Sequence, residues 1–411
     1  MKNLKIYLMI LILCIPFIQC SNHSTPTKHK TPVDLTTVEK NLVESDNKFG
    51  LKLFREINQT QKDSNIIISP LSVSVCLGMV YNGADGKTKE DMQKILELEG
   101  LNIEEVNQSY QHIMELLSGL DPEVQFQIAN SIWYRLNDLI PKEEFLSVCQ
   151  KYFDALIKGM NFDDPGIIDS INLWVEENTN GKIKEIWEGK EISSQTIMFL
   201  VNAIYFKGAW TYQFDKNKTK DDLFYISDGS TKPCKMMEQR GFFKNFGNNT
   251  FWALDLPYGD GNYSMTIFLP HWGTDIDSLI AEFSQDNLNQ WLSSFKNDSL
   301  NIYLPRFKLE YEKLLNEELK SLGMQIAFTP GAADFTKMYY ILPGQVWIDT
   351  VLHKTFIEVD EKGTEAAAAT IVEMIKGPSG FRVDHPFIFM IREKSSQTIL
   401  FIGKILDPTY D

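Results

Sequence analysis

The sequence predicts an α+β fold in one domain. Helical patterns dominate the first part of the chain, strand patterns dominate the later part, and the two show little regular alternation. From residue 38 to Asp411 there is no low-complexity linker, repeat or block of like charge, so a single domain over 38–411 is the simplest organisation. Because 43% of the 411 residues are hydrophobic, this domain can bury a sizeable core.

The first 19 residues have the pattern of an export signal. Two lysines precede an apolar run from Ile6 to Ile18, which is too short for a good transmembrane helix. The run ends at Cys20 without a small-residue cleavage pattern and resembles a bacterial lipoprotein signal, although Gln19 replaces the usual small residue. We expect export with a lipid on Cys20, at the cell surface or outer membrane. Ordinary secretion is the alternative, and residues 20–37 are predicted to be a flexible polar tether.

The charge balance argues against a nucleic-acid partner. The formal net charge is −15, and no basic cluster offsets it locally. An acidic surface repels phosphate backbones.

Four segments have the spacing and boundary residues of helices. A helix beginning at Ser69 has that residue as its cap, Pro70 at the first position and Gly83 at its end. The others are expected over Leu35–Asn58, over Thr88–Leu98 and over Ile167–Asn178, the last with Gly181 as its stop signal.

Strands are predicted from apolar runs and turn residues. Gln195–Trp210 is apolar almost throughout, which is typical of a strand covered on both faces. Phe251–Gly259 and Tyr263–Pro270 form a hairpin around a Gly-Asp-Gly-Asn turn. Ser299–Glu312 is predicted as one strand with an edge or bulge at Pro305. Pro386–Leu406 is predicted as a second hairpin.

No motif for enzyme catalysis or metal binding is present. The sequence has no G-x-S-x-G, H-E-x-x-H or G-x-G-x-x-G, and its six histidines lack ligand spacing. Outside the signal, the cysteines are Cys76, Cys149 and Cys234, an odd number far apart, so buried free thiols are expected rather than disulfides. We therefore expect no metal, no cofactor and no enzyme activity.

The segment from Thr364 to Ile375 fits neither a helix nor a loop well. Its alanines offer only a thin apolar stripe to a helix, and it is too apolar for a plain loop. As a strand, Glu365 and Glu373 share one face because they are eight residues apart. The opposite face is then uncharged and small near its start. Such a segment could enter a gap in an existing sheet at low steric cost.

This segment and several others resemble the serpin family. "EKGTEAAAAT" is similar to the hinge of the serpin reactive-centre loop nearly letter for letter. In chain order, the other matching segments are "SNIIISPLSVSVCLGMVYNGADGKTKEDMQKIL", "FLVNAIYFKGAW", "LDLPYGDGNYSMTIFLP", "LPRFKLEYEKLLNEELKSLGM", "HKTFIEVDEKGTEA" and "DHPFIFMIRE…ILFIGKILDP". So many ordered motifs are highly specific.

The resemblance implies a fold and a mechanism. The fold has three β-sheets, eight to nine helices and an exposed reactive-centre loop. A protease cleaves the loop and forms an acyl-enzyme, and the loop then inserts into the central sheet before water releases the ester. Insertion adds strand pairing that the native state lacks, so the native fold is metastable.

The resemblance also assigns roles to single residues. It places Ser69, Ser72, Asn202 and His353 in the shutter beneath the central sheet, and Trp210 in the breach where insertion begins. At the loop base, Glu361 is expected to pair with Arg306, which has a bidentate option. The hinge comprises Glu361, Gly363, Thr364, Glu365, Ala366, Ala367, Ala368, Ala369 and Thr370.

The reactive bond is expected between Lys376 and Gly377. Counting from Glu361 gives Gly377 as the specificity residue, whereas counting back from the "HPF" motif gives Ile375. Lys376 lies between the two and suits a trypsin-like pocket. Met374 and Ile375 are alternatives that suit apolar pockets.

These features together predict a monomeric inhibitor that traps serine proteases covalently. Trypsin-like enzymes are favoured, and elastase-like or cysteine proteases are further candidates. The alternative is a non-inhibitory serpin that acts as a binding protein or chaperone. Such members commonly carry charged, bulky or proline residues in the hinge, and Ala366–Ala369 lack these.

Overall fold

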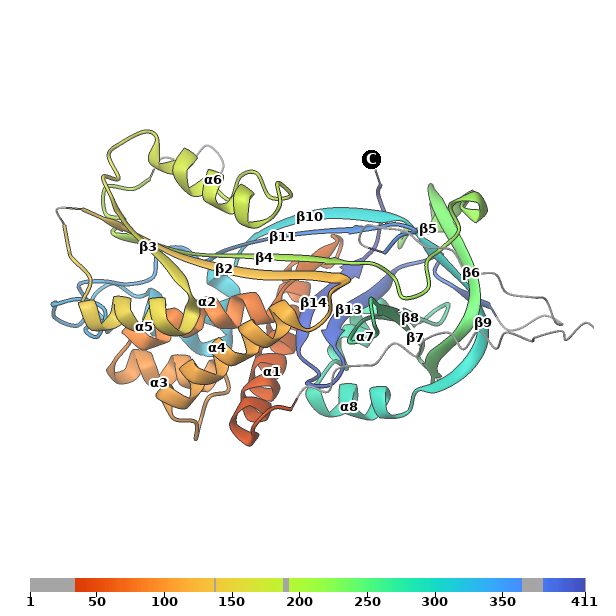
Figure 1. Ribbon diagram of the computed structural model, residues 1–411, viewed down its shortest axis with the longest axis horizontal. Coiled ribbons are helices and arrows are strands. Elements are labelled where there is room, and N and C mark those ends of the chain that lie inside the picture. The colour runs from red at the N-terminus through yellow and green to blue at the C-terminus, as the bar shows by residue number, and fades with distance from the viewer. Residues whose placement is uncertain (1–33, 137, 188–191, 364–379, 411) are drawn as a thin grey trace, which may run out of the picture.

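The computed structural model describes residues 34–136, 138–187, 192–363 and 380–410. Within them lie nine α-helices: α1 Thr37–Thr60, α2 Pro70–Gly83, α3 Gly86–Ile95, α4 Ile103–Gly119, α5 Glu143–Phe153, α6 Ile167–Asn178, α7 Ile276–Ala281, α8 Gln285–Ser293 and α9 Asn316–Leu319 (Figure 1). The strands are β1 Ile66–Ile68, β2 Val124–Arg135, β3 Ala155–Met160, β4 Met198–Gly208, β5 Lys220–Tyr225, β6 Thr231–Gly247, β7 Phe251–Tyr258, β8 Tyr263–Pro270, β9 Lys296–Pro305, β10 Phe307–Leu314, β11 Leu352–Val359, β12 Gly380–Arg382, β13 Phe387–Glu393 and β14 Ile399–Ile405.

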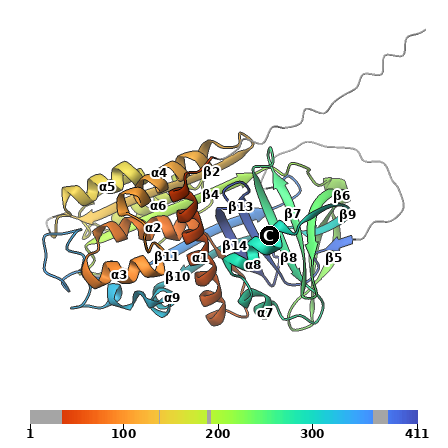
Figure 2. The same cartoon turned by 90° about the horizontal axis from the view of Figure 1, so that it is seen from below.

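The strands form three sheets, as predicted. The largest has nine strands in the order β1-β14-β13-β8-β7-β6-β9-β12, with β5 paired to β6. The other two are the three-stranded sheet β3-β2-β4 and the two-stranded sheet β10-β11. These two smaller sheets lie side by side in one layer, with α6 on one face and α2, α4 and α5 on the other (Figure 1). The helices α2 to α5 gather at one end of the molecule, opposite β5, β6 and β9 (Figure 2).

Helix α1 begins with a capping box that the sequence analysis missed. The Glu39 amide donates to the Thr36 hydroxyl, and the Thr36 amide donates to the Glu39 carboxylate. This exchange satisfies two donors at the helix start. Leu35 is buried in the core. Leu35 and Thr36 therefore pack against and cap the first helix. The sequence analysis had placed them both in the predicted helix Leu35–Asn58 and in the predicted tether 20–37.

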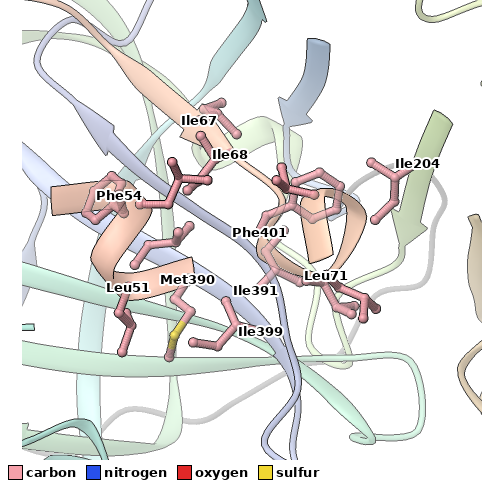
Figure 3. Close-up of a cluster of buried hydrophobic side chains, with 14 of the residues drawn as sticks. Leu51, Phe54, Ile67, Ile68, Leu71, Ile204, Met390, Ile391, Ile399 and Phe401 are labelled. Carbon is pink, nitrogen blue, oxygen red and sulfur yellow. The ribbon is translucent and has the colours of Figure 1, made fainter. Parts of the chain in front are cut away.

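The main core lies between the helices and the nine-stranded sheet (Figure 3). Leu51 and Phe54 of α1 meet Met390 and Ile391 of β13 there. The same cluster includes side chains from β1, α2, β4 and β14. A second cluster lies on the other face of the β2-β4 sheet, beneath α6, and includes Trp133, Ile171 and Ile183. Apolar side chains on both faces explain why residues Ala203–Phe206 of β4 are buried in succession.

Both predicted hairpins are confirmed. β7 pairs antiparallel with β8, and β13 pairs antiparallel with β14. Helices α2 and α6 have the predicted bounds, whereas α3 starts at Gly86 and ends at Ile95 rather than spanning 88–98.

The single strand predicted over Ser299–Glu312 is wrong. β9 ends at Pro305 and β10 begins at Phe307, and the two belong to different sheets. Pro305 has no amide hydrogen to continue a ladder, so the chain leaves one sheet there and enters the other. Arg306 lies at this crossing.

All three cysteines outside the signal are free thiols, as predicted. Cys149 and Cys234 are buried, but Cys76 is only partly buried because it lines a cavity described below.

Candidate functional site

The junction between β4 and β11, here called the seam, is the central feature of the site. Both strands are fully described, and they pair with β2 and β10 respectively but not with each other. They run in the same direction. Their amino ends lie near each other, since Phe199 and Leu200 line the same cavity as Val351 and Leu352. Their carboxyl ends also lie near each other, since Ala209 forms a bridge with Gly363.

Two cavities lie along the seam. One, of about 240 Å³, lies toward the carboxyl ends and is lined by β4, β11 and the segment 179–183 after α6. The other, of about 520 Å³, lies toward the amino ends and has mostly apolar walls from α2, α6, β4 and residues 345–352. The seam is therefore loosely packed in the part of the chain that the structure describes. Parallel strands with unpaired facing edges leave backbone donors and acceptors available to a third strand.

The first turn of α2 bridges the two sides of the seam from below. The backbone amide of Ser69 donates to Nε2 of His353 on β11, at 3.1 Å. The hydroxyl of Ser72 donates to the side-chain carbonyl of Asn202 on β4. Ser69 also caps the helix, since its hydroxyl accepts from the Ser72 amide at 3.3 Å. The four residues that the family resemblance grouped are thus brought together by one helix end, in two separate pairs.

Two further polar residues of this network were missed. Asn130 on β2 accepts a hydrogen bond from Asn202 at 2.7 Å and donates to the backbone carbonyl of Phe153, also at 2.7 Å. Thr355 on β11 donates to the carbonyl of Ile67 at 3.0 Å. Both strands carry several other polar residues, so no local pattern in the sequence singles out Asn130 or Thr355.

His353 is held as a neutral imidazole. Its Nε2 accepts the Ser69 amide proton, so the ring proton resides on Nδ1. Burial lowers the pKa of His353 to about 4, because removal from water disfavours the charged ring.

Trp210 closes the carboxyl end of the seam. Its ring stacks on Tyr258 at 4.3 Å between centroids. Its indole Nε1 donates to the backbone carbonyl of Asp360 at 3.0 Å, and its backbone amide donates to the backbone carbonyl of Lys362 at 2.9 Å. This one residue therefore ties the end of β4 to the turn that follows β11.

Glu361 pairs with Arg306, as the sequence analysis expected. Arg306 Nε donates to Oε1 of Glu361 at 2.8 Å, and Arg306 Nη2 and the Thr219 hydroxyl also contact Oε1. The bidentate option is not used, because all three donors converge on one oxygen and Oε2 is buried without a partner. Burial pushes the pKa of Glu361 upward, but the hydrogen bonds from Arg306 and Thr219 outweigh it and hold the pKa below its ordinary value.

Gly363 lies between the two sides of the seam. It forms antiparallel bridges with Ala209, after β4, and with Asp360, after β11. Its φ of +117° favours glycine, and a Cβ there would lie 2.4 Å from the Trp210 nitrogen and 2.5 Å from the Gly208 oxygen. The turn 360–363 thus reverses the chain, and only glycine fits at its end.

The remaining predicted loop residues lie outside the described ranges. These are Thr364, Glu365, Ala366, Ala367, Ala368, Ala369, Thr370, Met374, Ile375, Lys376 and Gly377, and Cys20 of the signal also lies outside. In the described part of the chain, no group of three or more His, Cys, Asp or Glu residues is placed to hold a metal ion. No helix among the described residues has the length and hydropathy needed to span a bilayer.

Comparisons with known proteins agree with this architecture. A family model described as Serpin (serine protease inhibitor) matches residues 44–408. Serpin B10 of Otolemur garnettii is 34% identical over 398 residues, covering 89% of this chain and 99% of the relative. Leukocyte elastase inhibitor A of Rattus norvegicus is 32% identical over 375 residues, covering 88% of this chain and 97% of the relative. The solved native structure of a thermophilic serpin, tengpin, is similar with a TM-score of 0.82 and 32% identity, covering 92% of this chain and 97% of that one.

These matches extend over most of the chain and over nearly the full length of each relative. The chain therefore belongs to the serpin family of protease inhibitors and is not an enzyme.

Proposed function

We propose that this protein inhibits serine proteases as a suicide substrate by inserting its cleaved reactive-centre loop into the seam. The observation that carries the proposal is Gly363, which is bridged antiparallel to both sides of the seam at its carboxyl end. A chain continuing in that direction would run antiparallel to both β4 and β11. It could then pair with both free edges, which are the edges that a new central strand needs.

The trapping reaction begins as ordinary proteolysis. The protease serine attacks the carbonyl carbon of Lys376, an ester forms, and the chain beginning at Gly377 leaves as a free amine. Water would normally hydrolyse the ester. In this proposal the freed segment 364–376 enters the seam first and drags the bound protease with it, so its catalytic groups are displaced and the ester persists.

The roles proposed for the site residues follow from their contacts. Ser69, Ser72, Asn202 and His353 hold the two sides of the seam from below until the strands separate. Trp210, Arg306 and Glu361 fix the end at which insertion starts. The residues Ala366–Ala369 are small enough to pass between the strands.

The experiment is an incubation with trypsin followed by denaturing electrophoresis after boiling. We expect a band of the combined mass that contains the protease and the N-terminal fragment ending at Lys376, with the cleavage site read by mass spectrometry. A Lys376→Glu variant is the control and should form far less complex, because a trypsin-like pocket binds a cationic side chain. Cleavage at Met374 or Ile375 would shift the target class to proteases with apolar pockets.

A non-inhibitory binding or chaperone role is the second candidate. Complete cleavage of the loop without any stable complex, by trypsin and by elastase-like and cysteine proteases, would favour it and contradict the trapping proposal.

We further propose that the protein is exported and carries a lipid on Cys20. The sequence pattern before Cys20 and the polar segment after it support this. Mass spectrometry of the mature N-terminus tests it: a diacylglyceryl mass on Cys20 is expected, and an unmodified N-terminus cut elsewhere would indicate ordinary secretion.

A further inference from the structure

A short segment crosses the seam on the face covered by α6. Residues 179–183 follow α6 and line the 240 Å³ cavity together with β4 and β11. Ile183 is buried in the cluster beneath α6, which includes Val201 and Ala203 of β4 and packs against Leu352 and Phe356 of β11. Lys182, next to it, reaches β11: its Nζ lies 3.2 Å from Glu358 Oε2 and 5.3 Å from the centre of the Phe356 ring.

The local sequence holds Lys182 in this position. Asn180 and Gly181 have φ values of +52° and +70°, which form a tight turn directly after the helix. The Thr179 hydroxyl donates to the carbonyl of Val175 at 2.8 Å and accepts from the amide of Ile183 at 3.1 Å. Lys182 therefore projects from an ordered turn rather than from a loose loop.

The acceptor, Glu358, is fixed from its other side. The hydroxyl of Tyr410 donates to Glu358 Oε1 at 3.1 Å. The guanidinium of Arg306 lies 5.6 Å from the centre of the Tyr410 ring and is itself bound to Glu361. A polar chain of Lys182, Glu358, Tyr410, Arg306 and Glu361 thus runs from the segment over the seam to the base of the reactive loop.

We propose that Lys182, through its ion pair with Glu358, is a positioning residue that holds the segment 179–183 across the seam and slows entry of the loop. The inference rests on the proposed function. Its physical basis is that an inserted strand must separate β4 from β11. The segment 179–183 contacts both strands, and the ion pair adds a charged link from this segment to β11. The ion pair is made in the native state and must break before insertion, so removing it lowers the barrier.

The test compares the wild type with Lys182→Met, which removes the charge but keeps an apolar stem over Phe356. Entry of a strand is measured directly with a synthetic peptide of residues 364–377, followed by native electrophoresis. The efficiency of trapping is measured as the number of protein molecules cleaved per trypsin molecule trapped. We expect Lys182→Met to take up the peptide about threefold to tenfold faster than the wild type. We also expect fewer molecules of this variant to be cleaved for each trypsin molecule that is trapped.

Lys184→Met is the matched control, because Lys184 is exposed directly after the segment and the change in charge is the same. It should behave like the wild type, and Lys182→Arg should restore the wild-type rate. The difference between wild type and Lys182→Met should shrink in 1 M NaCl, because the ion pair is partly exposed to solvent and is screened by salt.

The outcomes separate this inference from the proposed function. Equal peptide uptake by wild type, Lys182→Met and Lys184→Met, with normal trapping of trypsin, overturns the role of Lys182 alone. Uptake that is faster in both methionine variants indicates a general charge effect and also overturns it. A wild type that neither takes up peptide nor traps any protease overturns the proposed function, and the inference with it.

Discussion

The imidazole of His353 makes the stability of the seam dependent on pH. The unfolded chain binds a proton at an ordinary histidine pKa of 6.5, whereas the folded protein binds it only near pH 4. The neutral ring therefore makes its full contribution to the free energy of unfolding above pH 6.5, and this contribution is lost as the pH falls toward 4. At about 1.4 kcal/mol per pH unit, the loss approaches roughly 3 kcal/mol.

Urea unfolding of the wild type and of His353→Gln at several pH values measures this effect. The glutamine can accept the Ser69 amide but cannot be protonated, so its stability should fall less between pH 6.5 and 4. Parallel pH curves for the two proteins would show that His353 is not the group responsible.

Arg306 is expected to stabilise the folded protein through its positive charge, which compensates the negative charge of Glu361. The carboxylate is buried and its Oε2 has no partner, so Arg306→Met would leave a buried anion with only the Thr219 hydroxyl. Removal of one partner of such a pair costs about 3 kcal/mol or more. Thermal unfolding should therefore show a clear drop in Tm for Arg306→Met and a smaller one for Arg306→Lys, which keeps the charge. An unchanged Tm in the methionine variant would contradict this account.

At the scale of elements, the hinge of the reactive loop decides between inhibition and simple cleavage. Ala366→Arg would place a guanidinium on the face that must lie against the core, where burial of an unpaired charge is costly. We expect trypsin still to cleave the loop of this variant while the covalent complex disappears. Ala367→Arg is the matched control, because in an extended strand its side chain lies on the opposite face. Full inhibition by Ala366→Arg would rule out insertion through this segment.

Local patterns in the sequence predicted some elements well and others poorly. α2 and the two hairpins were predictable because caps, prolines and turn residues mark their ends. The crossing at Pro305 was not, because a proline within an apolar run indicates an interruption but not which sheet each half joins. The pair of Arg306 and Glu361 could be predicted from the resemblance to a family. Asn130 was missed because it is a single amide whose partner, Asn202, lies 72 residues away in the sequence. The unpaired edges of β4 and β11 depend on tertiary arrangement and have no local signal.

For the whole molecule, the open seam predicts that cutting the reactive loop stabilises the protein. A cut normally frees chain entropy and destabilises a fold. Here the freed segment would pair with β4 and β11 and bury Val372 and Met374, which together contribute roughly 3 kcal/mol at ~25 cal/mol per Å² of apolar area. Each backbone hydrogen bond adds about 0.5–1.5 kcal/mol.

Thermal melts of intact and loop-cleaved protein measure this directly, with a sample cut in the N-terminal tether as the control. The loop-cleaved form should melt at the higher temperature, and the tether-cleaved form should match the intact protein. A Tm that is equal or lower after loop cleavage would mean that the segment does not insert.

The position of Tyr410 has a practical consequence for handling the protein. Tyr410 takes part in the fold, because its hydroxyl donates to Glu358 and its ring faces Arg306. A preparation from which proteolysis has removed Tyr410 would lack both contacts. Intact-mass measurement is therefore the appropriate quality control before any kinetic comparison.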